Sequence, residues 1–351
     1  MKIIYIDTAI DGHHLTYLSA LIKGADNDHV LILPEKVESR GVKQYVCTDK
    51  DSSEQRTFQS YCNWMKQIKA IVKKEKPDVV HFLYGDVFYR YFGYGLGALK
   101  GIKTIITLHW ARTGILQKIS TKMICSQVDV AVVHSSYIKT LISGYGANNV
   151  VHIEYPQFNT NMVTKEDACG YWGISTEIPT IACIGHTRQD KGLDILLEAL
   201  DQVDKPFQLL VAGKEDSFDR TFIEEKILKY QDRVRLCLKY LTDEELANAL
   251  GAADIIALPY RKTFNGASGP LGEGVALNKC IVGSNHGNLG DTIEKNHLGY
   301  TFESENSSAL AEILNRALID KFKPDNVYIR YQESLNVDAF IESYHSLYHI
   351  N

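Results

Sequence analysis

Short apolar runs rich in β-branched residues alternate along the chain with longer stretches whose apolar residues recur at helical spacing. The first series of runs lies at residues 2–6, 30–33, 78–83, 103–108, 128–133 and 150–153, with helix-like stretches at 15–22 and 58–74. The second series lies at residues 180–184, 208–212, 234–238, 255–258 and 279–282, separated by helix-like stretches at 193–200, 222–229, 243–250 and 271–277. Continuous apolar runs separated by helices are typical of strands that are buried on both faces. The order therefore predicts an α/β protein whose parallel sheets are covered by helices on both sides.

The alternation pauses at residues 159–175, which are polar and irregular, and then begins again. We therefore predict two Rossmann-like domains, an N-terminal one at 1–165 and a C-terminal one at 166–335. The last segment, 336–351, contains a helix-like stretch that we expect to pack back on the N-terminal domain. Ligands of open parallel sheets bind at the carboxyl ends of the strands, so the strand-end loops of both domains are expected to face a central cleft.

Charge and composition exclude several classes of protein. The formal net charge of −5 argues against a protein that coats nucleic acid, because such domains are usually basic. The seven cysteines are an odd number and form no Cys-x-x-Cys pair, so we expect reduced thiols and no metal site. Neither a secretory signal nor a run of about 18 apolar residues is present, and we expect a cytoplasmic protein.

The segment around residues 264–277 carries the clearest candidate chemistry. Small residues at 266–269 lead into a helix that Pro270 opens. The amino end of a helix offers unpaired backbone N–H groups to a phosphate, and glycines let the phosphate approach the backbone. Glu273 follows within the first turns, where its carboxylate can accept two hydrogen bonds from a ribose diol. The alternative is a tight strand-to-helix turn followed by an exposed glutamate.

This segment resembles the Glu-x7-Glu region of retaining glycosyltransferases of the GT-B fold, especially those of glycosyltransferase family 4. Glu273 falls on the second glutamate, which binds the donor ribose in the family. Asn265 stands at the first position, so the family's charge near the transferred sugar is absent from this chain. An amide still hydrogen-bonds sugar hydroxyls, and the resemblance implies that Asn265 belongs to the catalytic centre.

A second resemblance lies upstream, at residues 184–192. This stretch is similar to the family's Gly-Arg-Leu…Lys-Gly loop, with Lys191 at the lysine that contacts the diphosphate. His186 stands at the family's arginine, and Arg188 is the candidate for the second positive charge. Such a clamp would replace a divalent metal at the leaving diphosphate, so no metal or other cofactor is expected. The alternative is a pair of solvated surface charges.

Further segments resemble the family in the expected order. The stretches 210–215, 238–245 and 284–293 are similar to the two segments near the nucleobase and to a loop that lines the donor cleft. The resemblance implies a nucleobase region at Gly213, Lys214, Tyr240 and Leu241. It implies donor contacts at Gly12, Arg188, Lys191, Gly266, Ser268, Gly269, Leu271 and Glu273.

The N-terminal half resembles the family more loosely. Gly12 follows the first strand, where the family has a glycine-rich loop at the diphosphate and sugar. His109 lies in a Thr-x-His motif that implies a catalytic position near the sugar or acceptor; its alternative is a structural histidine at a strand end. We interpret His81 as structural and Ser135 as a helix cap.

The resemblance implies a hexosyltransferase-type enzyme that moves a sugar from a nucleotide-diphosphate sugar to a hydroxyl of a sugar, glycan or lipid-linked acceptor. Retention of configuration, metal independence and a place in polysaccharide or glycoconjugate biosynthesis follow from the same resemblance. The alternatives are a nucleotide-sugar epimerase or hydrolase, and a non-catalytic nucleotide-sugar-binding subunit. The lysine-rich stretch at 64–76 is either a contact with an anionic membrane, which would make the protein peripheral at its inner face, or a solvated helix face.

Overall fold

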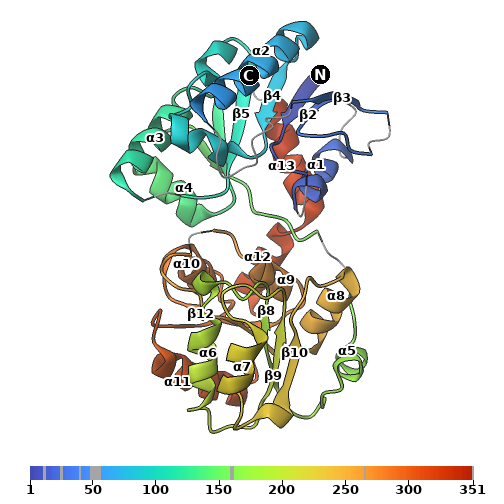
Figure 1. Cartoon of the computed structure of the whole chain (residues 1–351), viewed down its shortest axis with the longest axis vertical. Helices are drawn as coiled ribbons and strands as arrows, with labels where there is room; N and C mark the ends of the chain where they lie inside the picture. Colours follow the sequence, from blue (N-terminus) through green and yellow to red (C-terminus); the bar gives the residue numbers. More distant parts are fainter. Residues whose placement is uncertain are drawn as a thin grey trace. The chain divides into compact units, whose positions relative to one another are not determined.

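Two units, each built on its own parallel sheet, make up the structure (Figure 1). The first unit comprises Met1–Tyr155 and Val337–Asn351, and the second comprises Pro156–Asn336. The computed structural model describes residues 1–10, 13–23, 27–38, 41–47, 57–111, 113–158, 162–264 and 266–349. Gly12 and Asn265, both predicted site residues, lie outside these ranges.

The sheet of the first unit has the strand order β3-β2-β1-β4-β5-β6-β7, and all its pairs are parallel. Its described strands are β1 (Lys2–Ile6), β2 (Asp28–Leu33), β3 (Lys43–Val46), β4 (Val79–Phe82), β5 (Lys103–Leu108), β6 (Val130–Val133) and β7 (Val150–His152). Ile4 in β1 pairs with Val30 in β2 and with Val80 in β4. The chain therefore leaves β1 to one side and later returns to its other side, which creates a topological switch point between β1 and β4.

Helices cover this sheet on both faces (Figure 1). They are α1 (His13–Lys23), α2 (Phe58–Glu75), the 3₁₀ helices η1 (Gly85–Tyr91) and η2 (Leu96–Leu99), α3 (Ile115–Cys125), α4 (Ser136–Ser143) and, from the end of the chain, α13 (Val337–His349). Tyr61, Trp64 and Ile68 of α2 are buried in the core. The apolar face of α2 is thus occupied by the core, and most of its lysines are exposed, so contact of residues 64–76 with a membrane stays a prediction.

The sheet of the second unit has the order β10-β9-β8-β11-β12-β13 and is also parallel. Its described strands are β8 (Thr180–Ile184), β9 (Gln208–Ala212), β10 (Val234–Cys237), β11 (Ile255–Leu258), β12 (Cys280–Ser284) and β13 (Gly299–Phe302). The switch point lies between β8 and β11. The loops that follow these two strands hold the predicted site residues 188–191 and 266–269.

Alternate residues of the central strands belong to different cores, as the two-residue period of a strand requires. The described helices of this unit are α5 (Lys165–Trp172), η3 (Gln189–Lys191), α6 (Leu193–Leu200), α7 (Arg220–Lys226), η4 (Gln231–Arg233), α8 (Asp243–Ala252), α9 (Gly269–Ala276), α10 (Gly287–Lys295), α11 (Ser307–Ile319) and α12 (Asn326–Ser334). Leu209 and Val211 of β9 pack in a cluster with α6, α7 and α11, whereas Leu210 and Ala212 pack with α8, α9, α10 and α12.

The predicted α/β class with two Rossmann-like domains is confirmed. Several of the described elements were not predicted, including the helices α3, α4, α10, α11 and α12. The edge strands β3 and β13 were not predicted, because each is short and only partly buried. The stretch predicted to be irregular contains α5, which Thr164 caps at its amino end and Gly173 ends in the left-handed conformation.

Candidate functional site

The loop after β8 is held against the end of β11 by close backbone packing. Gly185 has φ of +117° and Gly192 has φ of +65°, conformations that glycine adopts without strain. A Cβ atom on Gly192 would overlap the carbonyl oxygen of Pro259, directly after β11. The loop therefore needs glycine at both ends, and it carries Lys191 to the switch point of the sheet.

Lys191 is a half-buried cation packed on two aromatic rings. Its Nζ lies 3.8 Å from the ring centroid of Tyr260 and 4.3 Å from that of Phe264. Burial, together with the nearby charge of Arg188, lowers the pKa of Lys191 from 10.5 to about 7. Within the described ranges, no carboxylate forms an ion pair with Lys191. An arriving anion would supply the missing counter-charge and restore the protonated form.

Arg188, the predicted second charge of the clamp, is already paired with a carboxylate. Its Nε and Nη2 donate to the two oxygens of Asp190 at 2.9 and 2.7 Å. This hydrogen bonding raises the pKa of the guanidinium. Arg188 therefore contributes positive potential beside Lys191, but a phosphate would have to share it with Asp190.

Arg261, which the sequence analysis did not select, fastens the same loop from the β11 side. Its guanidinium makes a forked ion pair with Asp194 at 2.9 and 2.6 Å and donates to the carbonyl of Gln189 at 2.9 Å. Its backbone N–H donates to the carbonyl of Asp190 at 2.9 Å. Planar bidentate pairs of this kind fix geometry, so Arg261 positions the segment that carries Lys191. The only signal in the sequence was an arginine three residues beyond an apolar strand.

The helix α9 begins at the loop after β11, as predicted from the small residues and Pro270. Ser268 caps it by accepting a hydrogen bond from the N–H of Leu271 at 3.4 Å, and its Oγ lies 3.0 Å from the hydroxyl of Tyr260. Gly266 is buried, and its carbonyl accepts from Asn288 Nδ2 at 3.2 Å. The ring of Tyr260 therefore connects the cap of α9 with the ammonium of Lys191.

Glu273 lies one turn into α9 with a largely buried carboxylate. Burial raises the pKa of this carboxyl from 4.5 to about 7. Among the residues that the structure describes, no side chain or backbone group donates a hydrogen bond to it. Its charge contributes to raising the pKa of Tyr260, after burial, and so Glu273 belongs to the same cluster as Lys191. A buried carboxylate without a donor is poised to accept hydrogen bonds from a ligand.

The predicted nucleobase region surrounds an exposed aromatic ring. Tyr240 is 67% exposed; Lys214 Nζ lies 5.0 Å from its ring centroid, and the ring of His186 stands at 80° to it with centroids 5.1 Å apart. Gly213, with φ of +149°, packs so closely on Gly185 that a Cβ would overlap the Gly185 carbonyl. The structure thus brings Gly213, Lys214 and Tyr240 together, with the half-buried Leu241 beside them in sequence.

Thr187 joins the loop after β8 to the loop after β9. Its Oγ1 donates to the carbonyl of Phe218 at 2.6 Å and accepts from the N–H of Asp216 at 2.9 Å, while its N–H donates to the carbonyl of Lys214 at 3.0 Å. The residue is buried. These bonds hold the predicted nucleobase region and the predicted phosphate region in one framework, a role that no sequence pattern indicated.

In the first unit, His109 lies at the end of β5 with both its backbone and its ring engaged. Its N–H donates to Asp86 Oδ2 and its Nε2 donates to the carbonyl of Leu83, each at 2.9 Å. The ring stacks on Tyr84 at a centroid distance of 5.3 Å and an angle of 28°. Donation from Nε2 to a carbonyl leaves Nδ1 as the ring atom available for other hydrogen bonds.

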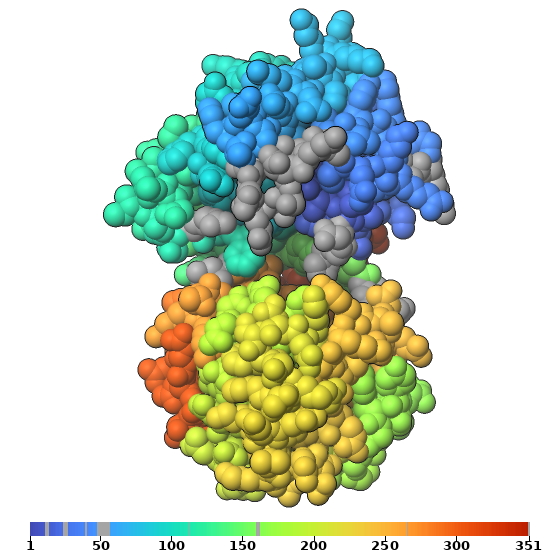
Figure 2. Space-filling model, viewed as in Figure 1, coloured from blue at the N-terminus to red at the C-terminus, as the bar shows by residue number. Residues whose placement is uncertain are grey.

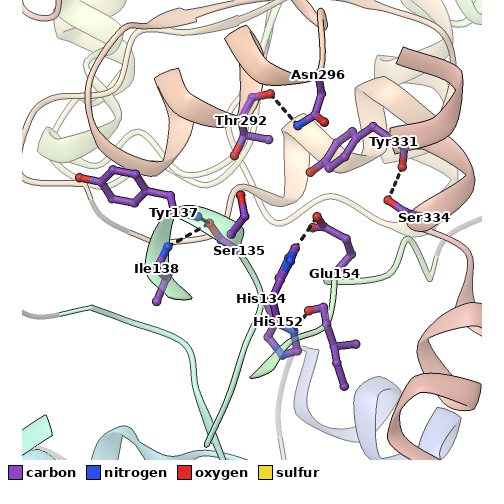
Figure 3. A network of polar contacts seen from close by, with 12 residues as sticks. His134, Ser135, Tyr137, Ile138, His152, Glu154, Thr292, Asn296, Tyr331 and Ser334 are labelled. Atoms are coloured by element: carbon purple, nitrogen blue, oxygen red, sulfur yellow. Dashed lines mark hydrogen bonds and ion pairs between the residues drawn. The ribbon is translucent and has the colours of Figure 1, made fainter. Parts of the chain in front are cut away.

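A chain of buried hydrogen bonds links α13 to the ends of β4, β5 and β6. Because the carbonyl of Ile153 only accepts, His134 Nδ1 donates to it at 2.8 Å (Figure 3). His134 Nε2 therefore accepts from the hydroxyl of Tyr17. This assignment fixes the direction of every other bond in the chain. Tyr344 donates to Tyr17, Thr107 donates to Tyr344, His81 donates to Thr107, and Tyr348 donates to His81. Burial lowers the pKa of His81 and of His134 to about 3, so both are neutral.

The structural interpretations of two residues agree with these contacts. His81 is fully buried within the chain just described. Ser135 caps α4 by accepting from the N–H groups of Tyr137 and Ile138 (Figure 3). Within the described residues, no cluster of metal-ligating side chains occurs, and no helix has the length and apolar character required to cross a bilayer.

Comparison with known proteins identifies the class of the second unit. Residues 178–320 match the model of the family described as Glycosyl transferases group 1. Together with the two parallel-sheet units, the match makes this chain a GT-B protein. The recognition made from residues 184–192 and 264–277 is thereby confirmed at the level of the GT-B glycosyltransferases, and membership of family 4 stays a prediction.

Individual relatives are similar at low identity. A glycogen synthase from Thermodesulfovibrio yellowstonii is 26% identical over 209 residues, covering 58% of this chain and 40% of that protein. An uncharacterized glycosyltransferase, MJ1178, from Methanocaldococcus jannaschii is 24% identical over 254 residues, covering 70% of this chain and 66% of that protein. The chain thus spans less than two thirds of the length of these curated relatives.

Solved structures match over nearly the whole chain. A sucrose-phosphate synthase from Thermosynechococcus elongatus superposes with a TM-score of 0.78 at 18% identity, covering 99% of this chain and 98% of that one. Anabaena Alr3699/HepE in complex with UDP superposes with a TM-score of 0.76 at 15% identity, covering 99% of both chains. At these identities the likeness establishes the fold.

Proposed function

We propose that the protein is a glycosyltransferase that moves a sugar from a nucleotide-diphosphate sugar to an acceptor hydroxyl. In this proposal the diphosphate binds between Lys191 and the amino end of α9, the ribose diol binds Glu273, and the base packs on Tyr240. The acceptor is expected to involve the N-terminal domain, where His109 resembles the family's strand-end histidine. The setting implied by the family is polysaccharide or glycoconjugate biosynthesis.

One observation carries the proposal: at the switch point of the second sheet, Lys191 and Glu273 are a half-buried cation and a largely buried carboxylate, and neither has an ion-pair partner among the described residues. Burying an uncompensated charge destabilises a protein, and natural chains keep such groups where a ligand compensates them. The anionic diphosphate would satisfy Lys191 and interact favourably with the amino end of α9, and a ribose diol would donate to Glu273. A single nucleotide-sugar supplies both complements.

The proposed chemistry uses positive charge where a metal ion acts in other transferases. As the bond between the anomeric carbon and the diphosphate breaks, negative charge accumulates on the leaving oxygen. Lys191, the amino end of α9 and the potential of Arg188 stabilise that charge. We propose that the reaction needs no divalent metal and that it retains configuration, as in the family that the sequence resembles. The acceptor hydroxyl loses its proton to the leaving phosphate in this scheme.

Uridine diphosphate is the first nucleotide to test, because a solved structure of the same fold contains UDP. Thermal unfolding is measured with UDP, GDP, TDP, ADP and CMP in the presence of EDTA, for wild type, Glu273→Ala and the exposed control Glu312→Ala. A ligand at 100 times its Kd adds about 2.7 kcal/mol to stability. We expect one diphosphate to stabilise the wild type and the control, but not Glu273→Ala.

Turnover separates the proposed transfer from its alternatives. Incubation of the matching nucleotide-sugar with a panel of acceptors should yield a glycoside and the free diphosphate, with no requirement for metal. Free or isomerised sugar without a glycoside would instead indicate a hydrolase or epimerase. Binding without any turnover would indicate a non-catalytic subunit. Absence of stabilisation by every nucleotide would contradict the donor site itself.

A further inference from the structure

The helix α3 of the first unit exposes an apolar face. Four large apolar side chains within nine positions are exposed: Ile115 by 79%, Leu116 by 66%, Ile119 by 48% and Met123 by 45%. Other exposed apolar residues, such as Leu228 and Ile319 in the second unit, are isolated on their helices or loops. Single exposed residues are ordinary, whereas a contiguous exposed patch marks an interaction surface.

The four exposed residues share one side of α3. At about 100° per residue they fall within an arc of about 100°, and the opposite side of the helix packs on the unit through Ser120, Thr121, Ile124 and Cys125. α3 therefore departs from the usual surface helix, because polar Ser120 and Thr121 are buried beside Ile124, whereas most of its large apolar residues face outward. Figure 2 shows that the green stretch that includes α3 and α4 lies on the surface of the first unit.

The segment of sequence that contains α3 is basic. Between Asp86 and Glu154 the chain has seven lysines and arginines and one acidic residue, Asp129, a local charge of +6 in a chain whose net charge is −5. Lys118 and Lys122 lie on α3 itself, and both are exposed. Asp86, on the packed 3₁₀ helix η1, is buried and accepts from backbone N–H groups, so it does not offset this charge at the surface.

A shallow depression beside the apolar face adds polar groups suited to a phosphate. It is lined by Lys118, Lys122, Thr140 and Tyr145, together with Ile119, Leu141 and Gly144. Lys118 Nζ rests 5.4 Å from the ring centroid of Tyr145, which holds the ammonium at the surface. Ammonium groups next to an exposed apolar stripe are complementary to anionic head groups above acyl chains.

We propose that α3 lies in the interface of an anionic phospholipid bilayer. Ile115, Leu116, Ile119 and Met123 enter the boundary between head groups and acyl chains, and Lys118 and Lys122 contact lipid phosphates. The partner is a lipid surface and not another protein, because the apolar stripe is bordered by Lys118 and Lys122, which form no ion pair within the described ranges, instead of by the mixed charges of a protein rim. This surface belongs to the first unit and the proposed donor site to the second, so membrane binding can be tested independently of the proposed transfer. It would bring the enzyme to a lipid-linked acceptor.

Flotation with vesicles tests the proposal on the full-length protein. The vesicles consist of phosphatidylcholine alone or of an equimolar mixture with phosphatidylglycerol. We expect binding to the anionic vesicles, weak binding to the neutral ones, and release as salt concentration rises. The double variant Leu116→Ser/Ile119→Ser should lose at least about tenfold in partition, because binding scales with the apolar area inserted. Lys118→Glu/Lys122→Glu should lose the preference for anionic lipid.

Leu228→Ser/Ile319→Ser is the matched control, since it removes two similarly exposed apolar side chains from the second unit and should bind like wild type. Unchanged thermal unfolding of all three variants shows that each is folded. Failure of wild type to bind anionic vesicles, or equal binding by the Leu116/Ile119 variant, overturns the proposal. Concentration-dependent dimerisation that the same variant abolishes, without vesicle binding, would assign the face to a second copy of the chain instead.

Discussion

Replacing Glu273 by glutamine should stabilise the ligand-free protein while weakening nucleotide binding. The carboxyl is largely buried without a hydrogen-bond donor among the described residues, and burial raises its pKa from 4.5 to about 7. Between these two values the unfolded chain has released a proton that the folded protein retains, so stability falls as pH rises through this window. Above pH 7 the folded protein carries the full penalty of the buried charge, and a neutral amide of the same shape does not.

The magnitude follows from the size of the shift. One pKa unit corresponds to about 1.4 kcal/mol, which gives about 3 kcal/mol for complete burial. The carboxylate keeps some contact with solvent, and screening reduces the expected gain to about 1–2 kcal/mol. For a unit of this length, such a gain raises the Tm by about 3–6 °C.

The assay compares thermal unfolding of wild type, Glu273→Gln and Glu312→Gln, at about pH 5 and about pH 8. Glu312 is exposed on α11, so its substitution controls for the loss of one negative charge. The gain should appear for Glu273→Gln at the higher pH and largely vanish at the lower one. A gain of equal size at both pH values would refute the reasoning, because it would arise from new hydrogen bonds of the amide and not from relief of the buried charge.

Three further substitutions probe the framework. Lys191→Met should weaken diphosphate binding about 10- to 100-fold in calorimetry, which is the contribution of one charged hydrogen bond. Because burial lowers the pKa of Lys191 to about 7, the substitution should also stabilise the ligand-free protein below pH 7, but not above pH 10.5, the usual pKa of lysine. Tyr344→Phe should lower the free energy of unfolding by about 1–3 kcal/mol, because it interrupts the buried chain from Tyr17, yet nucleotide affinity should stay unchanged. Gly213→Ala should lower both stability and nucleotide affinity, because its Cβ would overlap the Gly185 carbonyl; an unaltered Tm would show that this close approach relaxes freely.

The parallel order of the central strands was predictable because their apolar runs are continuous and β-branched. Helix caps were equally predictable: Thr242 and Glu245 have the Thr-x-x-Glu spacing of a capping box, which forms at α8, and Pro270 opens α9. The edge strands were not predictable, because a sequence such as Lys43–Val46 has neither a buried face nor a turn residue that distinguishes it from a loop.

The candidate site was predictable where the backbone dictates residue type and not where side chains from distant segments meet. Glycines and a proline before a helix suggested the phosphate region directly. The aromatic rings on which Lys191 packs belong to Tyr260 and Phe264, which lie some seventy residues further along the chain. They become neighbours of Lys191 only because β8 pairs with β11. The bidentate ion pair of Arg188 and Asp190 joins residues that are close in sequence, but no sequence pattern distinguishes it from two solvated charges.

The docking of α13 on the first unit sets the order in which the chain can fold during synthesis. Phe340 and Tyr344 complete a core whose other residues precede position 156. At about 5–20 residues per second, the ribosome needs roughly 10–40 s to add the second unit before these side chains exist. The second unit is continuous in sequence and can close as soon as it emerges, whereas the first waits, with Tyr17 and His134 lacking their final partners, until the last helix has been made.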